Sequence, residues 1–229
     1  SSRLARPATT ITFGVSAFGM QSQCPDPEFN FELRPLNGVK DSFDKVQLFL
    51  GGPVSELYLE YNDCDAENGC FASAPDHTIL NLKALTSGFR LAFPTNDTIH
   101  FYGASLEKRD ACGIIYHSIG ANGAKYSDYN KTSQFWKHLN KLNADCFIVS
   151  LGTNEAQDPN LTAEIFINDV KIMVSKLRLA SPEACIILTT PPVSYFKKSK
   201  PNPSLETITN ALIDYCNATN LVYWDLYSI

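Results

Sequence analysis

The sequence predicts an α/β protein in which a parallel-sheet domain follows a β-sandwich. Two observations carry this prediction. From about residue 9 to about residue 107 the chain consists of short runs, several of which alternate apolar and polar residues with the period of a half-buried strand. After about residue 110, apolar runs alternate with longer stretches of helical spacing, the order expected of parallel β/α units. We therefore expect a first domain over residues 1–108 and a second over residues 109–229.

Seven short runs are expected to form the strands of the first domain. Gly, Pro, Asn and Asp separate them at intervals of roughly 8–12 residues, the spacing typical of a β-sandwich. No stretch of this half shows good amphipathic helical spacing. The expected strands cover residues 10–20, 29–36, 45–52, 55–63, 77–85, 88–94 and 98–107.

Strands and helices alternate through the second half. Phe135, Leu139 and Leu142 recur at helical spacing, and a longer helix follows with a polar start and a Pro stop. Ser204, with Glu206 close behind, predicts a capped start for the last helix. The expected strands cover residues 113–120, 144–152, 184–192 and 221–229, and the expected helices cover residues 131–142, 161–182 and 204–220.

Composition and charge exclude several classes of partner. The 229 residues are 44% hydrophobic, enough for a sizeable core, and the net charge is −5 without a basic block. Neither nucleic acid nor an anionic membrane surface is therefore an expected partner. No apolar run approaches the roughly 18 residues that a membrane-spanning helix needs. No signal peptide opens the sequence as it stands.

The seven cysteines have irregular spacing. Cys64 and Cys70 flank a short polar loop and could form a local disulfide. Cys146 and Cys185 lie within apolar runs and are expected to be buried free thiols. The chain has no CxxC pair, so no structural zinc is expected, and no other metal or cofactor is implied.

Polar residues and glycines follow two expected strands of the second half. Gly120, Asn122 and Gly123 come after the first of them, and the segment Gly152-Thr153-Asn154-Glu155 comes after the next. Open α/β sheets place their chemistry at the carboxyl ends of the strands, so these segments should face one crevice. A glycine can present its backbone N–H there and an Asn its side-chain NH₂, a donor set that stabilises an oxyanion.

Each of these residues also has an ordinary structural interpretation. Gly120 and Gly123 could be turn glycines, and Asn154 could cap a loop or the next helix. Glu155 could be a supporting polar group or a solvated one. The two motifs are far more specific together, in this order, than either is alone.

The motifs Gly-Ala-Asn-Gly-Ala (residues 120–124) and Gly-Thr-Asn-Glu (residues 152–155) resemble the second and third sequence blocks of the SGNH, or GDSL-type, hydrolases. The branch that they resemble most contains the bacterial peptidoglycan O-acetylesterases. In that branch a sandwich similar to a carbohydrate-binding module lies between the first and second blocks. The resemblance implies a flavodoxin-like hydrolase domain after a jelly-roll-like sandwich.

The resemblance also implies a Ser-His-Asp esterase. Gly123 would give its backbone N–H and Asn154 its side-chain NH₂ to the oxyanion hole, and Asn122, Thr153 and Glu155 would lie at the substrate. The implied substrate is an O-acylated polysaccharide such as peptidoglycan or a plant glycan, with acetyl as the acyl group. The implied location is outside the cytoplasm of a bacterium, periplasmic or secreted.

The sequence departs from this family at both catalytic blocks. The Gly-Asp-Ser block of the nucleophile and the Asp-x-x-His block of the base are absent, so the site is incomplete in this chain. Asp97 and His100 have Asp-x-x-His spacing but lie in an expected sandwich strand, and Ser16 lacks the preceding Asp. His138 is expected to be solvated on its helix. Two rivals therefore remain: a non-catalytic carbohydrate-binding protein and an acyltransferase on the same scaffold.

Overall fold

The computed structural model describes residues 14–17, 19–35, 37–39, 41–61, 69–71, 74–110, 112–196 and 200–229. These residues divide into two compact units between Ile119 and Gly120. The domain boundary expected after residue 108 lies shortly before this division. Cys64, one partner of the possible local disulfide, is outside the described residues, and so is the side chain of Cys70.

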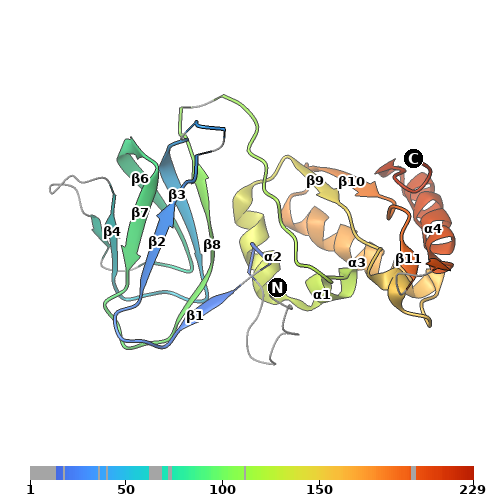
Figure 1. The fold of residues 1–229 in the computed structure, drawn as a ribbon, viewed down its shortest axis with the longest axis horizontal. Helices are drawn as coiled ribbons and strands as arrows, with labels where there is room; N and C mark the ends of the chain where they lie inside the picture. The colour runs from blue at the N-terminus through green and yellow to red at the C-terminus, as the bar shows by residue number, and fades with distance from the viewer. Residues whose placement is uncertain are drawn as a thin grey trace. The chain divides into compact units, whose positions relative to one another are not determined.

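Two antiparallel four-stranded sheets build the first unit (Figure 1). One sheet has the order β1-β8-β3-β6 and the other has the order β2-β7-β4-β5. The strands of the first sheet are β1 (Met20–Ser22), β8 (Ile99–Glu107), β3 (Phe43–Leu50) and β6 (His77–Thr86). Those of the second are β2 (Glu28–Glu32), β7 (Gly88–Ala92), β4 (Leu57–Glu60) and β5 (Gly69–Phe71).

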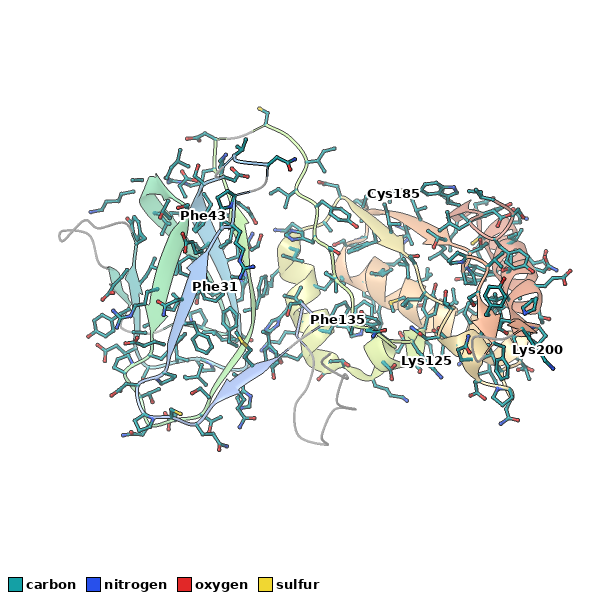
Figure 2. The ribbon with its side chains drawn as sticks, viewed as in Figure 1. Phe31, Phe43, Lys125, Phe135, Cys185 and Lys200 are labelled. Atoms are coloured by element: carbon teal, nitrogen blue, oxygen red, sulfur yellow. The ribbon has the colours of Figure 1, made fainter. Side chains whose placement is uncertain are left out.

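The two sheets share one hydrophobic core. Alternate residues of the strands point inward, so that Leu57 and Leu59 of β4 are buried together with residues from β3, β6, β7 and β8. Aromatic rings fill much of this core. Phe31 stacks on Phe89 at 4.7 Å between ring centroids, and Phe43 meets Phe89 edge to face. Figure 2 labels Phe31 and Phe43.

The strand expected over residues 10–20 differs from the structure in the part that is described. Residues 14–17 form a turn in which the N–H of Ala17 donates to the carbonyl oxygen of Gly14 at 3.0 Å. Ala17 has a φ of +58°, a left-handed conformation that a strand does not accommodate. Among the described residues of this region, the strand therefore begins at Met20.

The second unit is a parallel α/β unit, as the sequence predicts. Its sheet has the order β13-β10-β9, and both strand pairs are parallel. The strands are β9 (Cys146–Val149), β10 (Cys185–Thr189) and β13 (Val222–Trp224). The helices are α1 (Tyr126–Lys131), α2 (Ser133–Leu139), α3 (Ala163–Ala180) and α4 (Ser204–Thr219). Short elements complete it: η1 (Asn140–Leu142), η2 (Glu155–Gln157), β11 (Tyr195–Phe196) and β12 (Lys200–Pro201).

The two long helices begin where the sequence predicts. Thr162 precedes α3, and its side chain accepts the N–H of Ile165 at 3.2 Å. The expected cap of α4 by Ser204 is wrong: Ser204 is the first residue of the helix, and the side-chain oxygen of Asn202 accepts its N–H at 3.0 Å. Each helix buries one apolar stripe. None of the described helices is long and apolar enough to cross a membrane.

The run over residues 113–120 is not a strand in the structure. Ile114, Ile115 and Tyr116 are exposed, Ile114 by 95%. A strand exists only when a neighbouring strand accepts its backbone hydrogen bonds, and no described strand pairs with this run.

Cys146 and Cys185 are exposed, so the expectation of buried thiols is wrong. They lie side by side at the starts of β9 and β10, where Cys185 is labelled in Figure 2. The apolar run around each of them suggested burial on both faces of the sheet. In the structure their face is uncovered.

Candidate functional site

The first glycine motif forms a tight turn before α1. The N–H of Ala124 donates to the carbonyl oxygen of Ala121 at 3.0 Å, which places Asn122 and Gly123 at the two central positions. Gly123 has a φ of +86°, the conformation that the third residue of a type II turn requires and that favours glycine. Asn122 and Gly123 are both exposed, so this turn can present backbone groups to a ligand.

The second motif begins at the end of β9. Gly152 has a φ of +114°, and a Cβ there would stand only 3.2 Å from the ring of Pro191. The backbone conformation favours glycine, and a Cβ would also crowd the ring of Pro191. The chain then passes through Thr153 and Asn154, both half-buried, into η2. Gly152 keeps this loop close to the segment that follows β10.

A hydrogen bond joins the two motifs. The side-chain nitrogen Nδ2 of Asn154 donates to the carbonyl oxygen of Ala124 at 2.9 Å. Ala124 follows Gly123 directly, so the two residues expected to form the oxyanion hole lie close together although 31 positions separate them (154 − 123 = 31). The Asn154 amide has two N–H groups, and this bond uses one of them and fixes the plane of the amide. The other remains for a ligand.

Glu155 is buried beneath this pair, with 4% of its surface exposed. Its oxygen Oε1 accepts the N–H of Tyr126 at 2.7 Å, and Oε2 accepts the N–H of Gly152 at 3.0 Å. One carboxylate therefore bonds both to the start of α1 and to the loop that follows β9. Burial raises the pKa of this carboxyl above its ordinary value, against the opposing effect of the two backbone N–H donors. This geometry places Glu155 as a support for the loop.

The end of β10 carries a polar cluster that the sequence did not reveal. Thr190 is fully buried, and its hydroxyl donates to Asp225 at 2.8 Å while accepting the backbone N–H groups of Leu226 and Tyr227. Hydrogen bonds from Ser228 and Thr190 hold the pKa of Asp225 below its ordinary value. These hydrogen bonds hold residues 225–228 against the end of β10. Its only signal in the sequence is an Asp directly after an apolar strand.

Lys125 stands directly before α1, where Figure 2 labels it. Its backbone N–H donates to Asp128 at 3.0 Å, which holds the first turn of this short helix. Among the described side chains, no three His, Cys, Asp or Glu residues gather in a way that could hold a metal ion.

A separate hollow lies in the first unit. Gly51, Gly52, Pro53 and Ser55 of the loop from β3 to β4 line it, together with Asp97 of the loop from β7 to β8 and His100 of β8. Asp97 and His100, which the sequence sets at Asp-x-x-His spacing, therefore come together here, in the first unit. The hollow offers a carboxylate, an imidazole and a hydroxyl beside the apolar ring of Pro53.

His138 is buried, with 1% of its surface exposed, so the expectation of a solvated histidine is wrong. Its Nε2 lies 2.7 Å from the side-chain nitrogen of Gln134, one turn earlier in α2. The neighbouring lysines suggested an exposed helix face, but this side chain lies on the side of α2 that also buries Phe135 and Leu139.

Comparison with solved structures identifies the fold. A peptidoglycan O-acetylesterase aligns with a TM-score of 0.76 at 18% identity, over 98% of this chain and 62% of its own. A family 3 carbohydrate esterase from Talaromyces cellulolyticus aligns with a TM-score of 0.39 at 18% identity, over 52% of this chain and 59% of its own. A family 2 carbohydrate esterase from Clostridium thermocellum aligns with a TM-score of 0.32 at 10% identity, over 94% of this chain and 83% of its own.

No protein-family model matches the chain, and no curated protein matches it. The structural alignment with the peptidoglycan O-acetylesterase nevertheless confirms, at the level of the fold, the resemblance expected from the two motifs. This chain spans 62% of the length of that protein.

Proposed function

We propose that residues 120–229 belong to the catalytic domain of an SGNH-type serine esterase that removes O-acyl groups, acetyl above all, from a polysaccharide such as peptidoglycan or a plant glycan. Gly123 and Asn154 supply two donors of the oxyanion hole. The observation that supports the proposal is the hydrogen bond from Asn154 to Ala124, which joins the loop of Asn154 to the residue that follows Gly123.

The chemistry follows from what these donors can do. A serine hydroxyl attacks the ester carbonyl, and the carbonyl oxygen gains negative charge as the tetrahedral intermediate forms. The Gly123 N–H and the second N–H of the Asn154 amide stabilise that charge. The two motifs supply neither the serine nucleophile nor the histidine and aspartate that serve it. Glu155 positions both donors without touching the substrate, and Asn122 and Thr153 border the acyl group or the glycan.

We further propose that the two-sheet unit is a jelly-roll-like β-sandwich similar to a carbohydrate-binding module, inserted before the second motif of a bacterial enzyme that works outside the cytoplasm, at the cell wall or on secreted substrates. Shared fold with a peptidoglycan O-acetylesterase supports this assignment. We place its boundary after residue 108, directly beyond the end of β8 at Glu107.

The test is ester hydrolysis by the natural protein, purified from its source, with p-nitrophenyl acetate as substrate. Loss of one oxyanion donor typically lowers kcat by about 10²–10³-fold, so Asn154→Ala should show a loss of this size with little change in KM. Asn160→Ala, an exposed loop residue nearby in sequence, is the matched control and should keep full activity. Wild-type-like turnover of Asn154→Ala would exclude this oxyanion hole.

A second candidate function is glycan binding without catalysis. The hollow between the β3–β4 and β7–β8 loops favours it, because paired sugar hydroxyls suit the Asp97 carboxylate and the His100 ring while a sugar ring can pack on Pro53. Calorimetry of the natural protein with acetylated polysaccharide separates the two functions. Glycan binding without any p-nitrophenyl acetate turnover would favour this second function. Asp97→Ala should then weaken glycan binding, and Asn154→Ala should leave it unchanged.

Acyl transfer is the third possibility on this scaffold, with an alcohol in place of water. Adding a soluble sugar acceptor to the p-nitrophenyl acetate assay distinguishes it from hydrolysis. A hydrolase releases acetate in the same amount as p-nitrophenol, while a transferase yields acetylated sugar at the expense of acetate.

A further inference from the structure

Two cysteines lie next to each other in the parallel sheet of the second unit. In the register of β9 and β10, Cys146 is directly opposite Cys185, and the backbone N–H of Cys185 donates to the carbonyl oxygen of Asp145 at 2.9 Å. Neighbours in register point to the same side of a sheet. The two side chains therefore leave the sheet on one face, in adjacent positions.

The two thiols also interact with each other. Desolvation raises the pKa of the Cys146 thiol above its ordinary value, and the charge and the hydrogen bond of the Cys185 side chain raise it further. A hydrogen bond between two cysteine side chains requires their sulfur atoms to be in contact. Both residues are exposed in the structure, so the pair is open to reagents in solution.

The spacing of the strands permits a disulfide at this position. Neighbouring strands lie about 4.7–4.9 Å apart, and the Cα atoms of disulfide-bonded cysteines lie about 4.4–6.8 Å apart. Their Cβ atoms lie only about 3.5–4.5 Å apart, so two side chains that leave a sheet in parallel have to lean towards each other. A bond made in this way is strained, and strained or exposed disulfides are the ones that are readily reduced.

The pair does not belong to the candidate site. Cys146 and Cys185 are the first residues of β9 and β10, whereas Gly152 and Thr190 follow the carboxyl ends of these strands. A metal ion is a weak alternative, because among the described residues no third His, Cys, Asp or Glu joins the two thiols. Oxidation is the reaction that two adjoining thiols can carry out without a further group.

We propose that Cys146 and Cys185 form a reversible disulfide that links the start of β9 to the start of β10. The oxidant is a small-molecule disulfide such as oxidised glutathione. One cysteine thiolate attacks a sulfur of the oxidant and expels one small thiol, which leaves a mixed disulfide on the protein. The other cysteine thiolate then attacks the protein sulfur of that mixed disulfide and expels the second small thiol. The two protons that the cysteines lose go to the two small thiols, and the oxidant gains two electrons.

Peptide mapping detects this link directly. Trypsin cuts after Lys and Arg, so Cys146 falls in residues 142–171 and Cys185 falls in residues 179–197, and neither peptide contains another cysteine. The natural protein is reduced while folded, freed of reductant and incubated with oxidised glutathione. Remaining thiols are blocked with N-ethylmaleimide, the protein is digested without reduction, and the joined peptide is measured by mass spectrometry. A second sample receives dithiothreitol, without denaturant, before it is blocked.

We expect the joined peptide to hold most of both cysteines after oxidation. Dithiothreitol should lower its amount at least about tenfold, because a strained link opens without unfolding of the protein. Cys216, which is buried in α4, should carry no glutathione at any stage, which shows that the unit stays folded.

A pair of variants tests the second step of the exchange. In Cys146→Ser no neighbouring thiol expels the glutathione, so the mixed disulfide on Cys185 should be at least about tenfold more abundant than in the wild type. Cys112→Ser removes another exposed cysteine and is the matched control, which should leave the link unchanged.

Four results would overturn the proposal. The first is wild-type protein with glutathione on Cys146 and Cys185 and no joined peptide. The second is complete N-ethylmaleimide labelling of both cysteines after oxidation. The third is a joined peptide that contains residues 142–171 twice, which would assign the link to two copies of the chain. The fourth is a link that dithiothreitol opens only after the protein is unfolded, which would exclude a reversible bond.

Discussion

Removing the Glu155 carboxylate should destabilise the second unit far more than its single side chain suggests. The carboxylate accepts two buried backbone N–H groups, from Tyr126 and Gly152, and in Glu155→Ala neither keeps an acceptor. Each unsatisfied buried donor costs about 1–3 kcal/mol, so the free energy of unfolding should fall by about 3–5 kcal/mol. Glu155→Gln retains one carbonyl oxygen and should lose about 2 kcal/mol.

The measurement is urea unfolding of the 229-residue chain followed by tryptophan fluorescence. Both tryptophans of the chain, Trp136 and Trp224, belong to the second unit, so excitation at the tryptophan band reports on that unit alone. Glu183→Ala, an exposed position in the loop before β10, is the control and should stay within about 0.5 kcal/mol of wild type. If Glu155→Ala were no less stable than Glu183→Ala, the carboxylate would not hold the two segments together, and the argument for Glu155 as a positioning group would be refuted.

Three further predictions follow from contacts near the site. Burial raises the pKa of Glu155 in the folded state, so protonation of Glu155 adds stability that is fully present below the unfolded-state pKa of about 4.3 and is lost as pH rises through the folded-state value. The resulting slope of the unfolding free energy against pH should vanish in Glu155→Gln, and an unchanged slope would assign it to other groups. Asn202→Ala removes the acceptor at the start of α4 and a buried hydrogen bond from Asn202 Nδ2 to the carbonyl oxygen of Ala156 (2.8 Å). The free energy of unfolding measured in urea should therefore fall by about 2–3 kcal/mol. No loss of stability would mean that water replaces both hydrogen bonds. Gly152→Ala places a side chain on a backbone with positive φ beside Pro191. The free energy of unfolding should fall by about 2 kcal/mol, and the proposed esterase turnover of the natural protein should fall with it. Stability equal to that of the wild type would show that the loop adapts freely.

The parallel α/β architecture could be predicted because its signals are local. Continuous apolar runs and long amphipathic stretches mark β9, β10, α3 and α4 without any knowledge of their neighbours. The residues expected over 161–182 form α3 at Ala163–Ala180, and those over 204–220 form α4 at Ser204–Thr219. The short helix α1 was missed, because six residues carry too little of a period to recognise.

Other features depend on partners that the sequence does not reveal. Residues 113–120 have the composition of a strand, but a strand also needs a neighbour. Cys146 and Cys185 lie in apolar runs, but burial depends on whether a helix covers their face. The inward orientation of Glu155 depends on the N–H of Tyr126, which lies 29 positions away in sequence.

The candidate site could be predicted only in part. The sequence predicts that the turn around Gly123 and the loop around Asn154 converge, and the bond from Asn154 to Ala124 places them together. Their role as oxyanion donors stays a prediction until activity is measured. The Thr190–Asp225 cluster was missed, because a Thr at the end of a strand gives no sign of the three groups that its hydroxyl will contact.

The strand orders of the two units imply different folding speeds. In the second unit each strand pairs with the next strand of its sheet along the chain, so that paired residues such as Cys146 and Cys185 are 39 positions apart (185 − 146 = 39). In the first unit β1 pairs with β8, and Met20 meets Phe101 only after nearly the whole unit has been made. Folding rates fall as the sequence separation of contacts rises. We therefore expect the first unit to be the slower to fold, and to wait during synthesis until Ile99–Glu107 has left the ribosome.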